Sequence, residues 1–149
     1  MGVGVRAGAP KPDISSTDAF KRAMLNAKSV SYAPEGFTGI QVAKVFERLG
    51  IAEQMKPKTK PQQTAAGVPQ AVAAGEAELG LIVTTVLLSV RGVELVGPFP
   101  PELQNYLVYS AGVVAAGKQP DAAKALIKHL TAPKAVAVIK AKGFEPVAR

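Results

Sequence analysis

The chain has 149 residues, and its 18 Lys and Arg against 11 Asp and Glu give a formal net charge of +7 at pH 7. This length is expected to form one ordinary domain that buries roughly two-thirds of its unfolded surface without metals or crosslinks. The absence of cysteine excludes disulfides and thiol chemistry, and an apolar content of 48% favours a folded chain over a disordered one.

The positive charge raises nucleic acid as a partner, but its distribution argues against one. Basic residues are scattered, and the tight alternating cluster is confined to Lys56, Lys58 and Lys60. Three Tyr and five Phe are few for base stacking. No apolar run approaches the roughly 20 residues of a membrane span. We therefore expect neither nucleic-acid binding nor a membrane span.

The first third of the chain alternates predicted strands and helices. A short strand over residues 2–7 is followed by a helix that Ser16 or Thr17 can cap. A buried strand over 29–33 and a Gly- and Pro-containing turn then lead into a second helix, which begins near residues 38–39 and ends at Gly50. The expected inner faces of these helices are Phe20, Ala23, Met24 and Ala27 in the first, and Ile40, Ala43, Phe46 and Leu49 in the second.

The remainder continues the alternation. An edge strand is predicted over 56–61, a third helix begins near Pro69 and ends at Gly75, and a buried strand follows over 79–83. Thr84 and Thr85 suit the cap of a short helix before a strand over 93–96. Residues 106–115 are the longest strand candidate. Two helices follow, the second capped by Thr131 with Pro133. Strands separated by helices predict an α/β fold with a mainly parallel sheet flanked by helices.

Several short motifs carry a family resemblance through their order and spacing. They are Tyr-x-x-x-Gly-x-Thr-Gly at 32–39, Phe-Glu-Arg-Leu-Gly-Ile-Ala-Glu at 46–53, and the segments 72–80, 92–98, 109–112, 132–135 and 141–146. Together they resemble the second lobe of the periplasmic molybdate-binding proteins, which are type II solute-binding proteins of ABC importers. The resemblance implies a lobe-two-like domain over 1–117, C-terminal helices over 118–149 that normally pack on lobe one, and a first lobe that is otherwise missing.

The resemblance also implies a function. We expect a solute-binding component of an ABC importer in a one-lobe form, with a small, molybdate-like oxyanion as solute and an ABC permease as partner. It implies a periplasmic location, while the lack of a signal-peptide core at the first residues leaves a cytoplasmic one open. The alternative is a self-associating interaction module, or a gene fragment without a transport role.

Candidate ligand contacts follow from the chemistry of helix starts. Unpaired backbone N–H groups and a partial positive charge can hold an oxyanion there without a charged side chain. The resemblance places the contacts of this lobe at two such starts and at one strand end. Capping or packing would also account for the same residue types. The candidates are Gly36, Thr38 and Gly39 in the first start, Val68 in the second, and Val83 with Thr84 at the strand end.

The sequence offers no catalytic or metal-binding pattern. His129 is the single histidine and lies among apolar residues of a predicted helix. No nucleophile elbow or phosphate loop is present. We therefore expect no enzymatic activity, no metal and no cofactor. We also expect a homo-oligomer, because the C-terminal helices carry apolar stripes that lobe one would otherwise cover, at Leu126, Ile127, Leu130, Val136 and Ile139.

Overall fold

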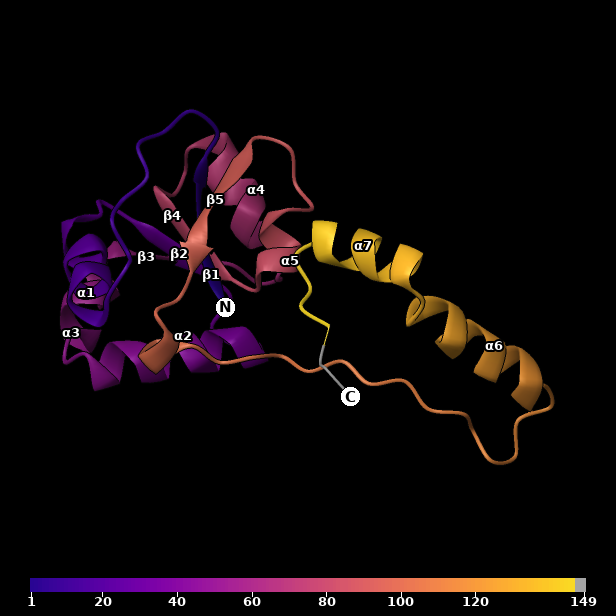
Figure 1. The fold of residues 1–149 in the computed structure, drawn as a ribbon. Coiled ribbons are helices and arrows are strands. Elements are labelled where there is room, and N and C mark those ends of the chain that lie inside the picture. The colour runs from indigo at the N-terminus through magenta and orange to yellow at the C-terminus, as the bar shows by residue number, and fades with distance from the viewer. Residues whose placement is uncertain (147–149) are drawn as a thin grey trace. The chain divides into compact units, whose positions relative to one another are not determined.

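A computed structural model describes residues 1–146 and divides the chain into two compact units, Met1–Tyr106 and Leu107–Arg149. The first unit contains a five-stranded sheet with the order β3-β2-β4-β1-β5 (Figure 1). The strands are β1 (Gly2–Arg6), β2 (Val30–Tyr32), β3 (Thr59–Pro61), β4 (Leu79–Ile82) and β5 (Val93–Pro98). The sequence predicts a domain boundary between residues 117 and 118, according to the lobe on which each segment is expected to pack. That assignment to lobes stays a prediction.

The sheet is mixed. Strand β2 is parallel to β3 and to β4, whereas β1 is antiparallel to both of its neighbours, β4 and β5. Strands β2, β3, β4 and β5 therefore run in one direction, and β1 runs against them. The predicted α/β class is confirmed, and the reversed β1 is the detail that the pattern missed. The direction of β1 is set by its pairing with β4 and β5, which lie far away in the sequence, so no local pattern indicates it.

Helices cover both faces of the sheet. The first unit has α1 (Thr17–Asn26), α2 (Phe37–Arg48), α3 (Ala52–Met55), α4 (Gly67–Ala74) and α5 (Thr84–Leu87), with the short 3₁₀ turns η1 (Lys56–Lys58) and η2 (Pro101–Leu103). Leu79 and Leu81 of β4 pack in the cluster that contains α1, α2 and α3 residues, whereas Ile82 packs with Val68 of α4 and Leu87 of α5. The alternation of side chains along the strand thus serves two helix layers.

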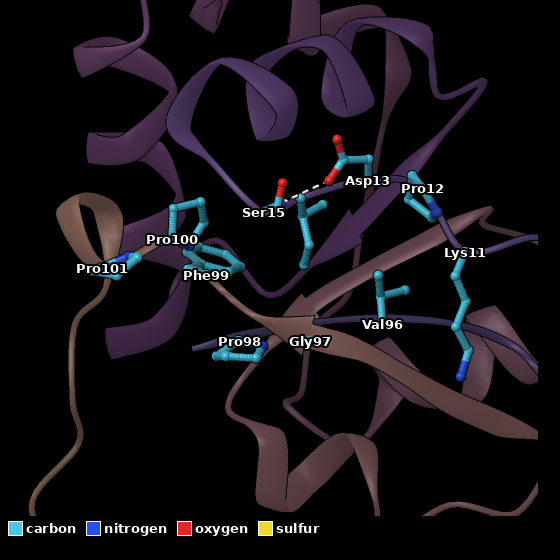
Figure 2. A pocket seen from close by; sticks show the side chains of 11 residues that line it. Lys11, Pro12, Asp13, Ser15, Val96, Gly97, Pro98, Phe99, Pro100 and Pro101 are labelled. Carbon is cyan, nitrogen blue, oxygen red and sulfur yellow. Dashed lines mark hydrogen bonds between the residues drawn. The ribbon is translucent and has the colours of Figure 1, made fainter.

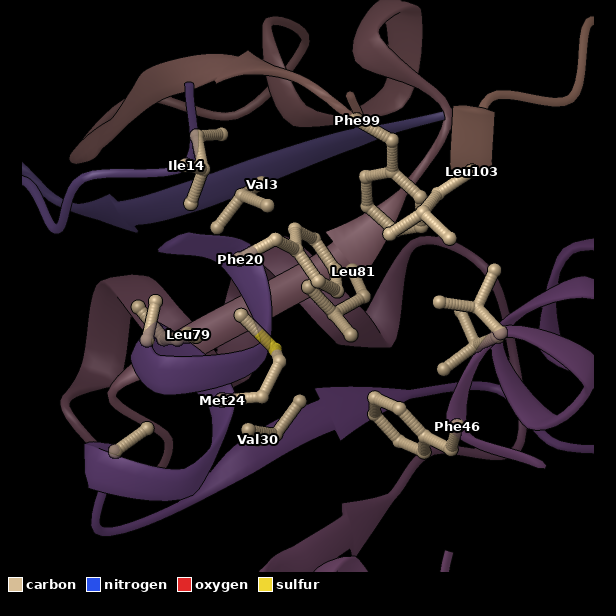
Figure 3. Close-up of a cluster of buried hydrophobic side chains, with 14 of the residues drawn as sticks. Val3, Ile14, Phe20, Met24, Val30, Phe46, Leu79, Leu81, Phe99 and Leu103 are labelled. Atoms are coloured by element: carbon tan, nitrogen blue, oxygen red, sulfur yellow. The ribbon is translucent and has the colours of Figure 1, made fainter. Parts of the chain in front are cut away.

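The larger core cluster lies between the sheet and α1 to α3. Phe20 of α1 is fully buried, and its ring centroid is 4.8 Å from that of Phe99. Figure 3 shows these two rings gathered with Val3 and Leu81 from the central strands. Such tilted aromatic contacts add to the free energy of burying the rings. The predicted inner face of the first helix is confirmed, because all four of its residues are buried.

Local signals explain where several helices begin and end. Ser16 is the N-cap of α1, and its hydroxyl accepts a hydrogen bond from the amide of Ala19 at 3.2 Å. Gly50 and Gly75 have φ angles of +67° and +79°, which suit the left-handed residue that ends a helix. The prediction for Thr84 as a cap is wrong, since Val83 is the N-cap of α5 and no side chain caps it.

The predicted inner face of α2 is partly wrong. Phe46 and Leu49 are buried as predicted, but Ile40 is 49% exposed and Ala43 is exposed as well. The buried side of the helix is formed by Gly39, Val42, Val45 and Phe46. The sequence assigns Ile40, and not Gly39, to the buried face because isoleucine is the more apolar residue. The structure turns the glycine inward because the helix backbone approaches the end of β2 there, and only a residue without a side chain fits.

The second unit contains α6 (Pro120–Leu130) and α7 (Pro133–Ala141), and neither helix has a buried residue. The strand predicted over 106–115 is wrong, because these residues form no strand and have no partner strand within 1–146. Ala132, and not Thr131, is the N-cap of α7; the Thr131 hydroxyl instead donates to the carbonyls of Ile127 and Lys128. No described helix is long and apolar enough to cross a membrane.

Candidate functional site

One edge of the sheet collects three helix starts. The parallel strands β3, β2 and β4 are neighbours and end at the same edge, and each leads into a helix: β3 into α4, β2 into α2, and β4 into α5. We call this the carboxyl edge. Crevices outside the carboxyl ends of parallel strands are the usual ligand sites of open α/β sheets. The antiparallel β1 begins at the same edge, where Gly2 pairs with Ile82 and Pro98.

The start of α2 presents free backbone donors. Gly36 is the N-cap, with no side-chain capping bond, and its own amide donates to the Ala33 carbonyl at 3.3 Å. The amides of the next three residues, Phe37, Thr38 and Gly39, have no hydrogen-bond partner within residues 1–146. These N–H groups and the helix dipole make this start positive. An anion could accept hydrogen bonds from them.

Gly39 explains how α2 comes so close to the sheet. A Cβ atom at this position would lie 1.9 Å from the carbonyl oxygen of Ala33 and 2.6 Å from the Cα of Pro34. Both are backbone atoms of the loop after β2. The helix therefore rests directly on the end of that strand. The role that this contact shows is structural; a direct contact between Gly39 and a ligand stays a prediction.

The start of α4 has fewer backbone N–H groups available to bind an anion. Val68 is fully buried, and its amide donates to the Ala65 carbonyl at 3.3 Å. The Gly67 amide donates to the carbonyl and the hydroxyl of Thr64, both at 3.2 Å, and Pro69 has no amide hydrogen. In this conformation Val68 contributes packing to the carboxyl edge, and ligand contact by Val68 stays a prediction.

Val83 and Thr84 lie at the start of α5, the third helix start of the carboxyl edge, and pack against the neighbouring elements of that edge. Val83 is half-buried and packs beside the cluster of Ala33, Val68, Ile82 and Leu87, so the three helix starts share one apolar support. The methyl group of Thr84 lies against β1, where a Cβ on Gly2 would meet it at 2.6 Å. The structure thus brings the predicted residues of all three segments to one edge. Whether they touch a ligand stays a prediction.

A polar network that sequence reasoning missed adjoins α2. The side-chain amide nitrogen of Asn105 (Nδ2) donates a hydrogen bond to the side-chain oxygen of Gln41 (Oε1) in α2 at 2.7 Å. The side chain of Gln104 accepts from the Met1 ammonium group at 2.6 Å and donates to the Met1 carbonyl at 3.0 Å. No local motif marks these residues, because the partners are 64 and 103 positions apart in the chain.

Two cavities of the first unit lie away from the predicted ligand-contact residues. One of about 410 Å³ lies between residues 11–15 and the end of β5, with Phe99 and four prolines in its wall (Figure 2). Another of about 330 Å³ is lined by α1 residues and by Glu78. None of the six predicted contacts lines either cavity. Neither of these two cavities is therefore part of the carboxyl edge.

Surface carboxylates near the first cavity are held ionised by their neighbours. Hydrogen bonds from the backbone and side chain of Ser15 lower the pKa of Asp13 below its ordinary value of 3.8. Lys11, whose ammonium nitrogen is 3.1 Å from the carboxylate, and the amide of Gly8 lower the pKa of Glu94 below 4.5. Both carboxylates are exposed, so these are surface interactions of small energy.

The basic cluster has local partners of its own. Lys56 pairs with Glu53 at 2.7 Å, and the Lys58 ammonium donates to the carbonyl of Leu25. Within residues 1–146, no group of three or more His, Cys, Asp or Glu side chains could hold a metal ion. The α2 start is thus the described feature with the strongest chemistry for an anion.

Comparison with known proteins places the chain among solute binders. A family model described as bacterial extracellular solute-binding protein matches residues 1–145. An aconitate isomerase of a Pseudomonas species is 35% identical over 148 residues, which are 99% of this chain and 56% of that protein. The molybdate-binding protein ModA of Azotobacter vinelandii is 33% identical over 131 residues, 85% of this chain and 49% of the relative. The chain thus spans about half the length of these relatives.

Solved structures agree on the fold. A substrate binding domain assigned to a molybdenum ABC transporter from Clostridium difficile superposes with a TM-score of 0.80 and 16% identity, covering 99% of this chain and 63% of that one. The periplasmic molybdate-binding protein of Azotobacter vinelandii gives a TM-score of 0.64 and 19% identity, covering 99% and 65%. At such identities the likeness establishes the α/β fold of these binding domains.

Proposed function

This chain belongs to the bacterial extracellular solute-binding protein family, and on that premise we propose that it captures a small anionic solute at the carboxyl edge. The observation that carries the proposal is the start of α2. Three consecutive amides, those of Phe37, Thr38 and Gly39, are free of partners within residues 1–146 and lie at the positive end of a 12-residue helix.

The class of solute follows from what such a start can recognise. Backbone N–H groups bind any compact group rich in negative oxygens, so oxyanions and carboxylates are both suitable. The curated relatives support this class, because molybdate is an oxyanion and aconitate a tricarboxylate. The Thr38 hydroxyl, which has no partner within residues 1–146, adds a further donor for the same anion.

Affinity for the chain alone is expected to be weak. A complete binder encloses its solute between two lobes, whereas the carboxyl edge contacts it from one side. Each charge-assisted hydrogen bond that a second lobe would add is worth roughly 1.5–3 kcal/mol, so losing several costs several orders of magnitude. We further propose transport as the role, an ABC permease as partner, and a periplasmic location, all from family membership.

A titration tests the binding proposal. Molybdate, sulfate and cis-aconitate would be added to the isotopically labelled chain, with amide shifts followed by NMR and heats by calorimetry. We expect the largest shifts at residues 37–39 and a dissociation constant weaker than micromolar. Thr38→Val should weaken binding a few-fold by removing one donor while it preserves shape. Lys28→Ala, an exposed residue that precedes β2 and so lies at the opposite end of that strand, should leave the affinity nearly unchanged. Shifts confined to Lys56, Lys58 and Lys60 would contradict the proposal.

A second candidate function is isomerisation of aconitate, favoured by the 35% identity to a protein of that name over nearly the whole chain. Such a reaction conserves the atoms of the substrate and needs a group that moves a proton. Glu35, in the turn directly before α2, is the titratable side chain closest in sequence to the free amides. New vinyl proton signals from cis-aconitate with the chain, but not with Glu35→Gln, would favour this candidate over capture.

Self-association is the remaining proposal. Of the predicted apolar stripes, Leu126 and Leu130 of α6 are 58% and 43% exposed, whereas Ile127, Val136 and Ile139 are partly buried. Exposed apolar stripes of this kind mark interaction surfaces. A second copy could cover them. Equilibrium sedimentation at micromolar concentration tests this, and monomer alone would count against it.

A further inference from the structure

A short segment that follows β5 is fixed to one side of α2 at two places. In the second turn of the helix, the side chain of Gln41 accepts a hydrogen bond from the side-chain amide of Asn105 at 2.7 Å. At the end of the helix, the guanidinium of Arg48 donates to the backbone carbonyl of Glu102 at 2.5 Å. We call residues 102–105 the strap. It belongs to the first compact unit, and it contacts α2 at points about two helical turns apart.

Core packing and β1 hold the strap in place. Leu103 is buried in the cluster that also contains Phe46 of α2, and Figure 3 shows its side chain beside Phe99. The side-chain nitrogen of Gln104 donates to the carbonyls of Met1 and Phe99, at 3.0 and 3.4 Å. The Phe99 amide also donates to the Met1 carbonyl at 3.2 Å. Because Met1 directly precedes β1, the strap links α2 to the carboxyl edge of the sheet.

The start of α2 is therefore supported on two sides. Gly39 rests on the backbone of Ala33 at the end of β2. Gln41 lies two positions further along the chain, so it points about 200° around the helix from that contact. The Ala33 backbone limits movement of the helix start toward the sheet, and Asn105 limits movement away from it. The free amides of residues 37–39 lie in the turn that these two contacts restrain.

We propose that Asn105 is a positioning residue of the anion site, and that its hydrogen bond to Gln41 holds the free amides of residues 37–39 in the geometry that binds the solute. This inference rests on the proposed function and adds a residue that acts on the site without touching the solute. The groups that contact a ligand depend on such supporting hydrogen bonds for their placement. Without the bond α2 still forms, because its backbone hydrogen bonds and buried residues remain, but its start is held on one side only.

Paired substitutions test this role, with sulfate as the probe and its affinity followed through the NMR signals of the amides of residues 37–39. Asn105→Leu and Gln41→Met nearly keep the size of each side chain and remove the bond, so each should weaken sulfate binding roughly 3- to 10-fold. The double variant should bind no more weakly than the weaker single variant, because both changes remove the same interaction. Gln54→Met makes the same change at an exposed position of α3 and should leave the affinity nearly unchanged.

An exchange of the two side chains separates positioning from general stability. Gln41→Asn shortens one partner and should weaken sulfate binding in the same way as Gln41→Met. Combining it with Asn105→Gln restores the total length of the pair without adding charge, so the affinity should return close to that of the wild type. A loss of packing or of helix stability alone predicts no such rescue. Should Asn105→Leu fail to fold by circular dichroism, Gln41→Asn and the exchanged pair carry the same test.

The two ways in which the inference can fail give different results. Sulfate may shift the amides of residues 37–39 in the wild type and bind every variant equally well, or the exchanged pair may bind no better than Gln41→Asn. Either result overturns the role of Asn105 and leaves the anion site standing. If sulfate shifts none of these amides in the wild type, the proposed function fails and the positioning role fails with it.

Discussion

Replacing Gly39 with alanine is a direct test of how α2 is positioned. The added Cβ would lie 1.9 Å from the Ala33 carbonyl oxygen and 2.7 Å from the Ala33 carbonyl carbon. To reach ordinary contact near 3.4 Å, the carbonyl oxygen and the new methyl group must separate by about 1.5 Å. Because both sides of the clash involve backbone, the separation requires the start of α2 to move away from β2.

The two energetic effects of this substitution oppose each other. Alanine favours a helix over glycine by about 1 kcal/mol, which would stabilise the chain. Overpacking costs about 1–3 kcal/mol, and the upper end applies because no flexible side chain can yield. The expected net loss is about 2 kcal/mol in the free energy of unfolding. With a urea dependence near 2 kcal/mol/M, the unfolding midpoint should fall by about 1 M.

Urea unfolding followed by far-ultraviolet circular dichroism measures this loss, since the chain has no tryptophan to report by fluorescence. Gly36→Ala is the matched control. Its Cβ would be 3.8 Å from the Ala33 oxygen, and the φ of −90° suits alanine, so its loss should be limited to the difference between glycine and alanine at an N-cap, about 0.5–1 kcal/mol. If Gly39→Ala were as stable as the wild type or more so, helix propensity would dominate and the close contact would be refuted.

Two further predictions concern charge. Glu35→Gln should raise the affinity for a doubly charged oxyanion roughly two- to five-fold at low salt, because it removes a carboxylate from the turn before the free amides. The gain in affinity should shrink at about 1 M salt, where charges are screened. An unchanged affinity, measured by calorimetry, would place Glu35 away from the anion. The pKa of Glu94 is lowered by Lys11 and Gly8, so its stabilising contribution is present above the ordinary value of 4.5 and is lost as pH falls through the lowered folded pKa. Glu94→Gln should therefore flatten the fall of unfolding free energy below about pH 5 in urea titrations, and an unaltered pH profile would contradict the role of this pair.

The sequence alone determined features that depend on neighbouring residues. Gly50 after α2 and Gly75 after α4 were identified correctly, and the start of α1 was narrowed to Ser16 or Thr17, because a cap acts on amides or carbonyls within a few positions of itself. The α/β class was also predictable, since the alternation of strand and helix patterns is carried along the chain. The order and spacing of the short motifs further sufficed to indicate the solute-binding family.

Tertiary structure decided what depends on remote partners. The direction of β1, the inward position of Gly39 and the hydrogen bond between Gln41 and Asn105 each require surfaces from distant parts of the chain. Residues 106–115 have the composition of a strand, yet they form none, because a strand needs a hydrogen-bonding neighbour and residues 1–146 provide none there. The carboxyl edge likewise exists through sheet order, which brings the starts of α2, α4 and α5 together although the sequence separates them.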